Sequence, residues 1–228
     1  MTRWGVQSVV AAVLAAALVA GCSKGGDTEI AKVRQNQKSG KTEAVAKQAQ
    51  SEDTAVARVA VEVLGHMGRE AVPYLQEAMK DKRPEIRETA AVALVEADPV
   101  DQQAAVAAVA RTDEAASVRA SACVALGQIY AFDQMETLFS ALEDPDRSVR
   151  ARASAAITRM VTRRYEVYID GPPDKRHNAV QKLREVWPQL DKTVRMHQEI
   201  LHGKKGAAKT AEKPPPPTRR ENPPQFPE

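Results

Sequence analysis

Aromatic residues are scarce in this chain of 228 residues, where Phe, Trp and Tyr together make up 4%. A buried core therefore has to be built from closely packed Ala, Val and Leu side chains. No run of alternating β-branched residues is long enough to predict a sheet. The apolar stretch at residues 9–20 is shorter than the roughly 20 residues that a membrane-spanning helix requires. These absences predict an all-α protein.

The residues that would carry chemistry are also few. None of the four His residues stands at a metal-ligand spacing from a Cys or a carboxylate, and neither a Gly-rich phosphate loop nor a Gly-x-Ser-x-Gly motif is present. We therefore predict no enzyme activity, no catalytic residues, no cofactor and no metal site. The net charge is only +3, from 33 basic and 30 acidic residues, which argues against a nucleic-acid partner.

What the chain does contain is a repeated pattern. An Asp is followed six residues later by an Arg, then by small apolar residues and a Leu or Ile, and the three Asp residues are 32 and 31 residues apart. A looser copy precedes these three, with Ala57 in place of the Arg. Repetition at this period predicts stacked helical hairpins. The signature residues are Asp81 and Arg87, Asp113 and Arg119, and Asp144 and Arg150.

The spacing inside one copy predicts how these residues act. Val118, Ala122, Ala125 and Leu126 share one face of a helix, and so many alanines on a buried face allow helices to approach closely. We expect each signature Asp to cap the helix that follows it. Because the first turn of a helix is a poor place for a lone cation, we expect each signature Arg to reach a carboxylate or carbonyl of a neighbouring repeat. Both residue types are predicted to be structural.

The pattern resembles the short bacterial HEAT-repeat family, of the kind also found in phycobilisome-lyase-type repeats. The matching elements are the Asp-to-Arg step, the Ala-rich helix and the Leu-Gly endings at residues 64–65 and 126–127. In the second copy, Glu96 and Ala97 stand where we expect the Gly. The resemblance implies a short right-handed α-solenoid of HEAT-type helical hairpins, with about four repeats at residues 51–168 and a C-terminal capping helix.

The N-terminus has the features of an export signal. Residues 1–21 combine a positive start with an apolar stretch of signal-peptide length. The residues at 19–22, Val-Ala-Gly-Cys, resemble a bacterial lipobox, which implies that Cys22 is lipidated and becomes the new N-terminus. Ser23 is not the Asp that favours inner-membrane retention in that family, so we predict a protein anchored on the periplasmic side of the outer membrane. An uncleaved anchor and an ordinary secretory signal are the alternatives.

The flanks of the repeats differ in composition. Residues 22–50 are predicted to be a flexible tether, in which residues 41–50 fit a half-repeat helix that caps the stack. Residues 169–203 are predicted to be a C-terminal capping segment, because Arg176, Ala179, Val180 and Trp187 resemble a finish that recurs in bacterial HEAT-repeat proteins. Residues 204–228 are basic and Pro-rich, and we predict a disordered tail.

This organisation predicts binding rather than chemistry. We expect a monomeric, lipid-anchored scaffold or adaptor that binds an envelope protein or peptide, and the membrane through Cys22. One alternative is a structural tether that engages cell wall or membrane through the tail, and another is a lyase-like accessory subunit of an exported enzyme. Exposed positions of the second helices are the predicted partner contacts, namely Tyr74, Glu77, Glu136 and Ser140.

Overall fold

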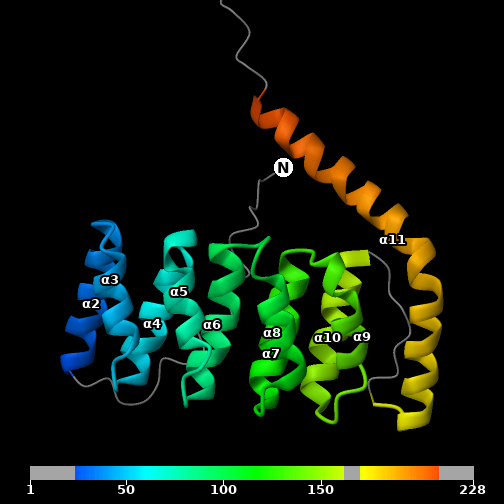
Figure 1. Cartoon of the computed structure of the whole chain (residues 1–228), viewed down its shortest axis with the longest axis horizontal. Coiled ribbons are helices and arrows are strands. Elements are labelled where there is room, and N and C mark those ends of the chain that lie inside the picture. The colour runs from blue at the N-terminus through cyan, green and yellow to red at the C-terminus, as the bar shows by residue number, and fades with distance from the viewer. Residues whose placement is uncertain (1–23, 162–169, 211–228) are drawn as a thin grey trace, which may run out of the picture. The chain divides into compact units, whose positions relative to one another are not determined.

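The computed structural model describes residues 24–161 and 170–210, and every regular element in these ranges is helical (Figure 1). The chain divides into two compact units, residues 1–185 and 186–228. The α-helices are α2 Lys24–Lys38, α3 Thr42–Ala49, α4 Thr54–Gly65, α5 Val72–Ala78, α6 Pro84–Ala97, α7 Gln103–Thr112, α8 Ala116–Gln128, α9 Met135–Ala141, α10 Arg147–Val161 and α11 Pro173–Thr210. Short 3-10 turns, Arg69–Ala71 and Phe132–Gln134, precede α5 and α9. The predicted all-α solenoid is confirmed.

The first unit consists of two layers of helices. The helices that carry the Asp–Arg pattern, α4, α6, α8 and α10, pack side by side in sequence order, and we call them the first layer. Helices α3, α5, α7 and α9 form the second layer, and each packs against the first-layer helix that follows it in the chain. Each repeat therefore contributes one helix to each layer.

The core between these helices is made of small and medium apolar side chains. Ile86, Ala90 and Leu94 of α6 are fully buried, as are Val118, Ala122 and Leu126 at the same positions of α8. Leucines of the second layer also lie in the core, with Leu75, Leu138 and Leu142 fully buried. The alanine-rich composition thus provides the close packing that a chain with few aromatics requires.

Two glycines set the closest approaches within the first layer. A Cβ added to Gly65 would lie 2.8 Å from the Cβ of Ala93, and one added to Gly127 would lie 2.6 Å from the Cβ of Ala156. The expectation that Glu96 and Ala97 replace this glycine in the second repeat was wrong. Val95, which directly follows Leu94, holds the position and is buried.

The N-terminal flank is more ordered than the sequence suggested. Residues 24–38, expected to be tether, form α2, which packs against α3 and α4, with Val33 fully buried. Helix α3 lies at the place expected for a half-repeat helix, and Val45, Ala46 and Ala49 are buried in it. Together, α2 and α3 form an additional helical hairpin against the first repeat.

A further Asp–Arg pair marks the beginning of α11. Asp170 and Arg176 are six residues apart, and the Arg176 guanidinium donates to the carbonyl of Gly171. Arg87 and Arg119 each bond the carbonyl five residues back in the same way. Val180 is fully buried, as a helix covering the last repeat requires.

The second unit continues α11 from Val186 to Thr210. The helix runs on through Pro188 and past residue 203, where the tail was predicted to begin. Val186 and Met196 are exposed, and Arg195 Nε donates to Asp191 Oδ1 at 2.7 Å. The signal peptide, Cys22 and residues 211–228 of the tail lie outside the described residues. In the part of the chain that is described, no helix is both long and apolar enough to span a membrane.

Candidate partner-binding surfaces

The signature arginines join each repeat to the next. Arg87 binds the carboxylate of Asp113 with two nitrogens, Nε at 2.9 Å and Nη2 at 3.0 Å. Arg119 binds Asp144 in the same way, at 2.8 Å and 3.0 Å. These contacts are the inter-repeat bonds predicted for a cation in the first turn. We call the series the Arg–Asp ladder, and each bidentate pair is one rung.

The third nitrogen of each guanidinium binds the loop of its own repeat. Arg87 Nη1 donates to the carbonyl oxygens of Asp81 and Lys82 at 2.8 Å and 3.3 Å. Arg150 Nη1 makes the equivalent bonds to Asp144 and Pro145 at 2.9 Å and 2.8 Å. Each signature Arg therefore holds its own loop, and Arg87 and Arg119 fasten that loop to the next one.

The signature aspartates organise these loops and do not cap the helices. Asp81 Oδ1 accepts the backbone N–H of Arg83 at 2.8 Å, and Asp113 Oδ1 accepts that of Ala115 at 2.9 Å. Arg83 and Ala115 are themselves the N-cap residues, without side-chain caps. The predicted capping role was wrong because each Asp lies two residues before the cap, where its carboxylate closes a turn.

The first repeat lacks a signature Arg, and an arginine of the next repeat takes over its bonds. Nη1 of Arg83 donates to the carbonyl oxygens of Ser51 and Glu52 at 2.9 Å and 3.4 Å. Its Nε and Nη2 donate to the two oxygens of Asp81 at 3.0 Å and 2.8 Å. These acceptors are the ones that an Arg at position 57 would bind. Sequence reasoning missed Arg83, since it lies outside the repeated pattern.

Hydrogen bonds between the Arg and Asp side chains favour the charged forms of both residues. Hydrogen bonds from the Arg83 side chain lower the pKa of Asp81 despite its partial burial. Burial raises the pKa of Asp113, but the hydrogen bonds from Arg87 and from the Ala115 N–H together hold it below its ordinary value. The pKa of Arg87 is raised, mainly by its bond to Asp113. The Arg83–Asp81 and Arg87–Asp113 pairs are therefore ionised at neutral pH.

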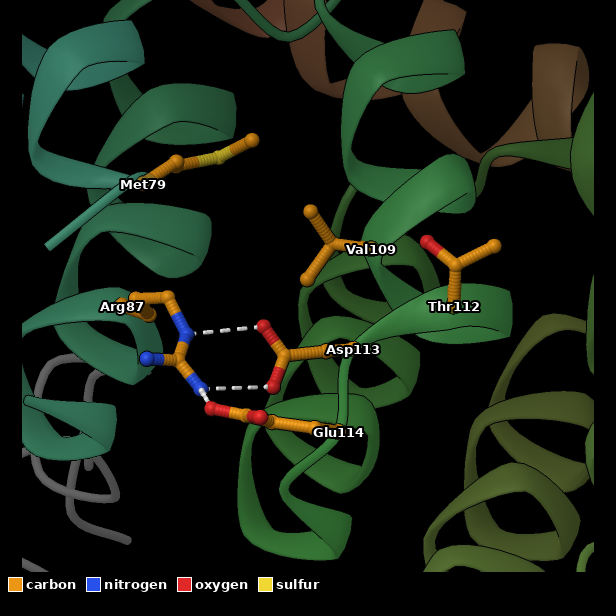
Figure 2. Close-up of a pocket in the computed structure, with 6 residues that line it drawn as sticks. All are labelled: Met79, Arg87, Val109, Thr112, Asp113 and Glu114. Carbon is orange, nitrogen blue, oxygen red and sulfur yellow. Dashed lines mark hydrogen bonds and ion pairs between the residues drawn. The ribbon is translucent and has the colours of Figure 1, made fainter. Parts of the chain in front are cut away.

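An open cleft lies above one rung, between the second-layer helices α5 and α7 (Figure 2). Met79 and Val109 face each other across it, and Arg87, Asp113 and Glu114 form its floor. Arg87 Nη2 bonds both Asp113 and Glu114, so every nitrogen of the guanidinium already has protein acceptors. The cleft thus offers apolar walls but no spare cation for an anionic ligand.

Comparison with protein families gives a match to HEAT repeats at residues 42–127. The match extends from the start of α3 to Gly127 in α8. The rung between Arg119 and Asp144 continues the same bonds to the loop before α10. A search of curated proteins finds no match. HEAT repeats are commonly scaffolds for protein–protein interaction.

The partner contacts predicted on the second-layer helices have different surroundings. Tyr74 is half-buried, and Glu77 is exposed and pairs with Lys80 at 2.9 Å. Glu136 and Ser140 of α9 are bound within the chain by Arg184 of α11. Two of the four predicted contacts are thus already occupied.

Helix α11 holds α9 through two side chains that the sequence did not indicate as functional. Arg184 donates to Glu136 Oε1 from Nη2 at 2.7 Å and to Glu143 Oε2 from Nη1 at 3.5 Å. His177 Nδ1 lies 2.6 Å from Glu143 Oε1. The spacing of His177 and Arg184, seven residues apart on one helix face, is the signal that could have placed them together.

The described residues contain no cluster of three or more potential metal ligands. Cys123 is fully buried, and burial raises the pKa of its thiol to about 12. It therefore lacks the thiolate character of a nucleophile.

Proposed function

We propose that this chain is a lipid-anchored HEAT-repeat scaffold that holds a protein or peptide partner at the cell envelope, and that it acts by binding and not by catalysis. The observation that carries the binding role is the ladder-linked stack of repeats. It presents two layers of helix surface on a rigidly joined frame. The lipobox-like residues ending at Cys22 support the anchor, and Ser23 favours the outer membrane.

A metabolic labelling experiment tests the anchor. The full chain and its Cys22→Ala variant are expressed in a bacterium fed with a clickable palmitate analogue. Label and membrane association in the full chain, and loss of both in the variant, are expected. Equal labelling of the two chains would reject lipidation at Cys22.

A crosslinking pull-down from native envelope tests the binding role, and compares the full chain with one that ends at residue 203. Recovery of the same defined protein with both chains supports the scaffold. Recovery only with the full chain, or of cell-wall material alone, supports the structural tether acting through the Pro-rich tail. A visible absorbance band in the purified chain would instead indicate a lyase-like accessory subunit with a bound chromophore.

A further inference from the structure

The first-layer helices expose one continuous face. In each helix the residues at equivalent positions, spaced three or four apart, are exposed or half-buried. Neighbouring helices in this layer pack directly against each other, so these positions form adjacent rows. We call this surface the first-layer face. On α6, α8 and α10 it contains Glu85, Glu88, Thr89, Val92 and Glu96; Ser117, Ser121, Val124 and Gln128; and Ser148, Ala151, Arg152, Ala155 and Arg159.

Charge on this face changes sign from one helix to the next. Helix α6 contributes three glutamates, Glu85, Glu88 and Glu96, and no cation. Helix α8 contributes no charge at all. Helix α10 contributes Arg152 and Arg159 and no anion. The face is therefore acidic over α6, neutral and small over α8, and basic over α10.

Several of these charges have no ion-pair partner within the described residues. Glu85, Glu88 and Arg152 form no ion pair at hydrogen-bonding distance within residues 24–161 and 170–210. Glu85 and Glu88 are like charges three residues apart on one helix, an arrangement that costs a few tenths of a kcal/mol. Exposed charges that form no ion pair within the chain are suited to an external partner of opposite charge.

The second layer provides a contrast. The exposed glutamates of α5 and α9 are paired within the chain, Glu77 with Lys80 and Glu136 with Arg184. Arg111 of α7 donates to Thr137 of α9 at 2.6 Å. From α5 to α9 the second-layer charges are thus engaged within the chain, so charges that remain for a partner lie on the first layer, opposite to where the sequence placed the contacts.

We propose that the first-layer face binds a protein segment that crosses α6, α8 and α10, with Lys or Arg over the α6 glutamates and Asp or Glu over the α10 arginines. This inference rests on the proposed function and adds the site and the charge order of the partner. Two interhelical spacings of 8–10 Å separate α6 from α10, roughly 16–20 Å in all. An extended segment of about six residues spans that distance. The small side chains of α8 let its backbone approach closely, and Val124 offers apolar contact at the centre.

Site-specific photocrosslinking in the native envelope fraction tests this proposal. The full chain carries p-benzoylphenylalanine at Ser117, on the first-layer face, or at Gln76, an exposed position of α5 in the second layer. Crosslinked peptides are identified by mass spectrometry. We expect a defined protein to be captured from Ser117, through a segment with basic residues on one side and acidic residues on the other.

Charge reversal tests the polarity of the face. Arg152→Glu with Arg159→Glu, and separately Glu85→Lys with Glu88→Lys, are expected to lower the crosslinking yield from Ser117 at least tenfold. Lys41→Glu with Lys47→Glu is the matched control, because it changes the net charge of exposed residues near α3 by the same amount as the arginine pair. Melting curves of all variants establish that they are folded.

The outcomes separate the two proposals. Capture only from Gln76, or a yield from Ser117 that neither reversal changes, would overturn the first-layer site while the scaffold function stands. Capture from neither position would overturn both. A captured segment without charges of opposite sign at its ends would refute the charge order.

Discussion

Arg83 offers a sharp test of the Arg–Asp ladder, because it replaces a missing signature residue from a different position in the chain. Its guanidinium binds Asp81 with two nitrogens and the carbonyl oxygens of Ser51 and Glu52 with the third. The Arg83→Ala substitution removes all of these bonds. The loop before α4 and the loop before α6 then lose the cation between them.

The cost of Arg83→Ala can be worked out from its surroundings. Only 17% of the Arg83 side chain and 19% of the Asp81 side chain are exposed, so water replaces the lost bonds incompletely. Removing one partner of a buried pair costs about 3–5 kcal/mol, and a hydrogen bond to a charged group about 1.5–3 kcal/mol. Because Asp81 keeps the Arg83 backbone N–H as a donor, we expect a loss of about 2–3 kcal/mol. For a domain of this size that lowers Tm by about 4–12 °C.

A second substitution distinguishes the ladder from a merely local effect. Ala57 occupies the signature position in the first repeat and is fully buried. Ala57→Arg is expected to restore most of the lost stability when Arg83 is Ala, because the new guanidinium can reach the same acceptors. In the wild-type background the same change is expected to destabilise the protein, since two cations would compete for one site.

Calorimetry and hydrogen exchange of the Ser51–Val56 amides measure these effects in all four chains of the cycle. Arg58→Ala is the control, because it removes a half-buried Arg from α4, the helix that contains Ala57. It should change Tm little. If the double variant is no more stable than Arg83→Ala alone, the idea that Arg83 replaces a signature Arg is refuted.

Three further predictions concern the ladder, the helix contacts and the buried thiol. The pKa of Asp113 is lower in the folded protein than in the unfolded chain. The stability that its ionised carboxylate contributes is therefore complete above about pH 4, and it is lost as the pH falls through the folded pKa. The difference in urea midpoint between wild type and Asp113→Asn should therefore shrink from pH 7 to pH 3, and a constant difference would contradict this. Gly127→Ala places a Cβ 2.6 Å from that of Ala156 and should cost about 1–3 kcal/mol in thermal melts, which Ala156→Gly should partly restore. Cys123, studied in a Cys22→Ser chain, should resist iodoacetamide at pH 8 when folded and react fully in urea, because its thiol is buried and its pKa is about 12.

The repeats could be predicted from the sequence because their bonds depend on short, fixed spacings. Arg87 follows Asp81 by six positions, and this one spacing implied both a helix start and a cation that needs a partner. Arg83 could not be found in this way. Its role follows from the distance between its loop and that of Ser51, 32 residues earlier, which only the packed structure fixes.

The segments on either side of the repeats also differ from prediction where tertiary contacts, and not local sequence, decide the structure. The Gly- and Lys-rich composition of residues 24–38 favours a tether, yet packing against α3 and α4 stabilises a helix there. The partner contacts at Glu136 and Ser140 were chosen for their exposure on one helix. Arg184, more than 40 residues further on, covers both.

The ladder also allows the number of repeats in this molecule to change by whole units. Each rung joins one loop to the next through the same set of atoms, so the joint does not depend on which repeats it connects. Removing residues 113–143, one repeat length, would bring Asp144 into the place of Asp113, opposite Arg87. Duplication or loss of a repeat by recombination would thus create no new kind of contact, and the span available to a partner could grow or shrink by one helix pair at a time.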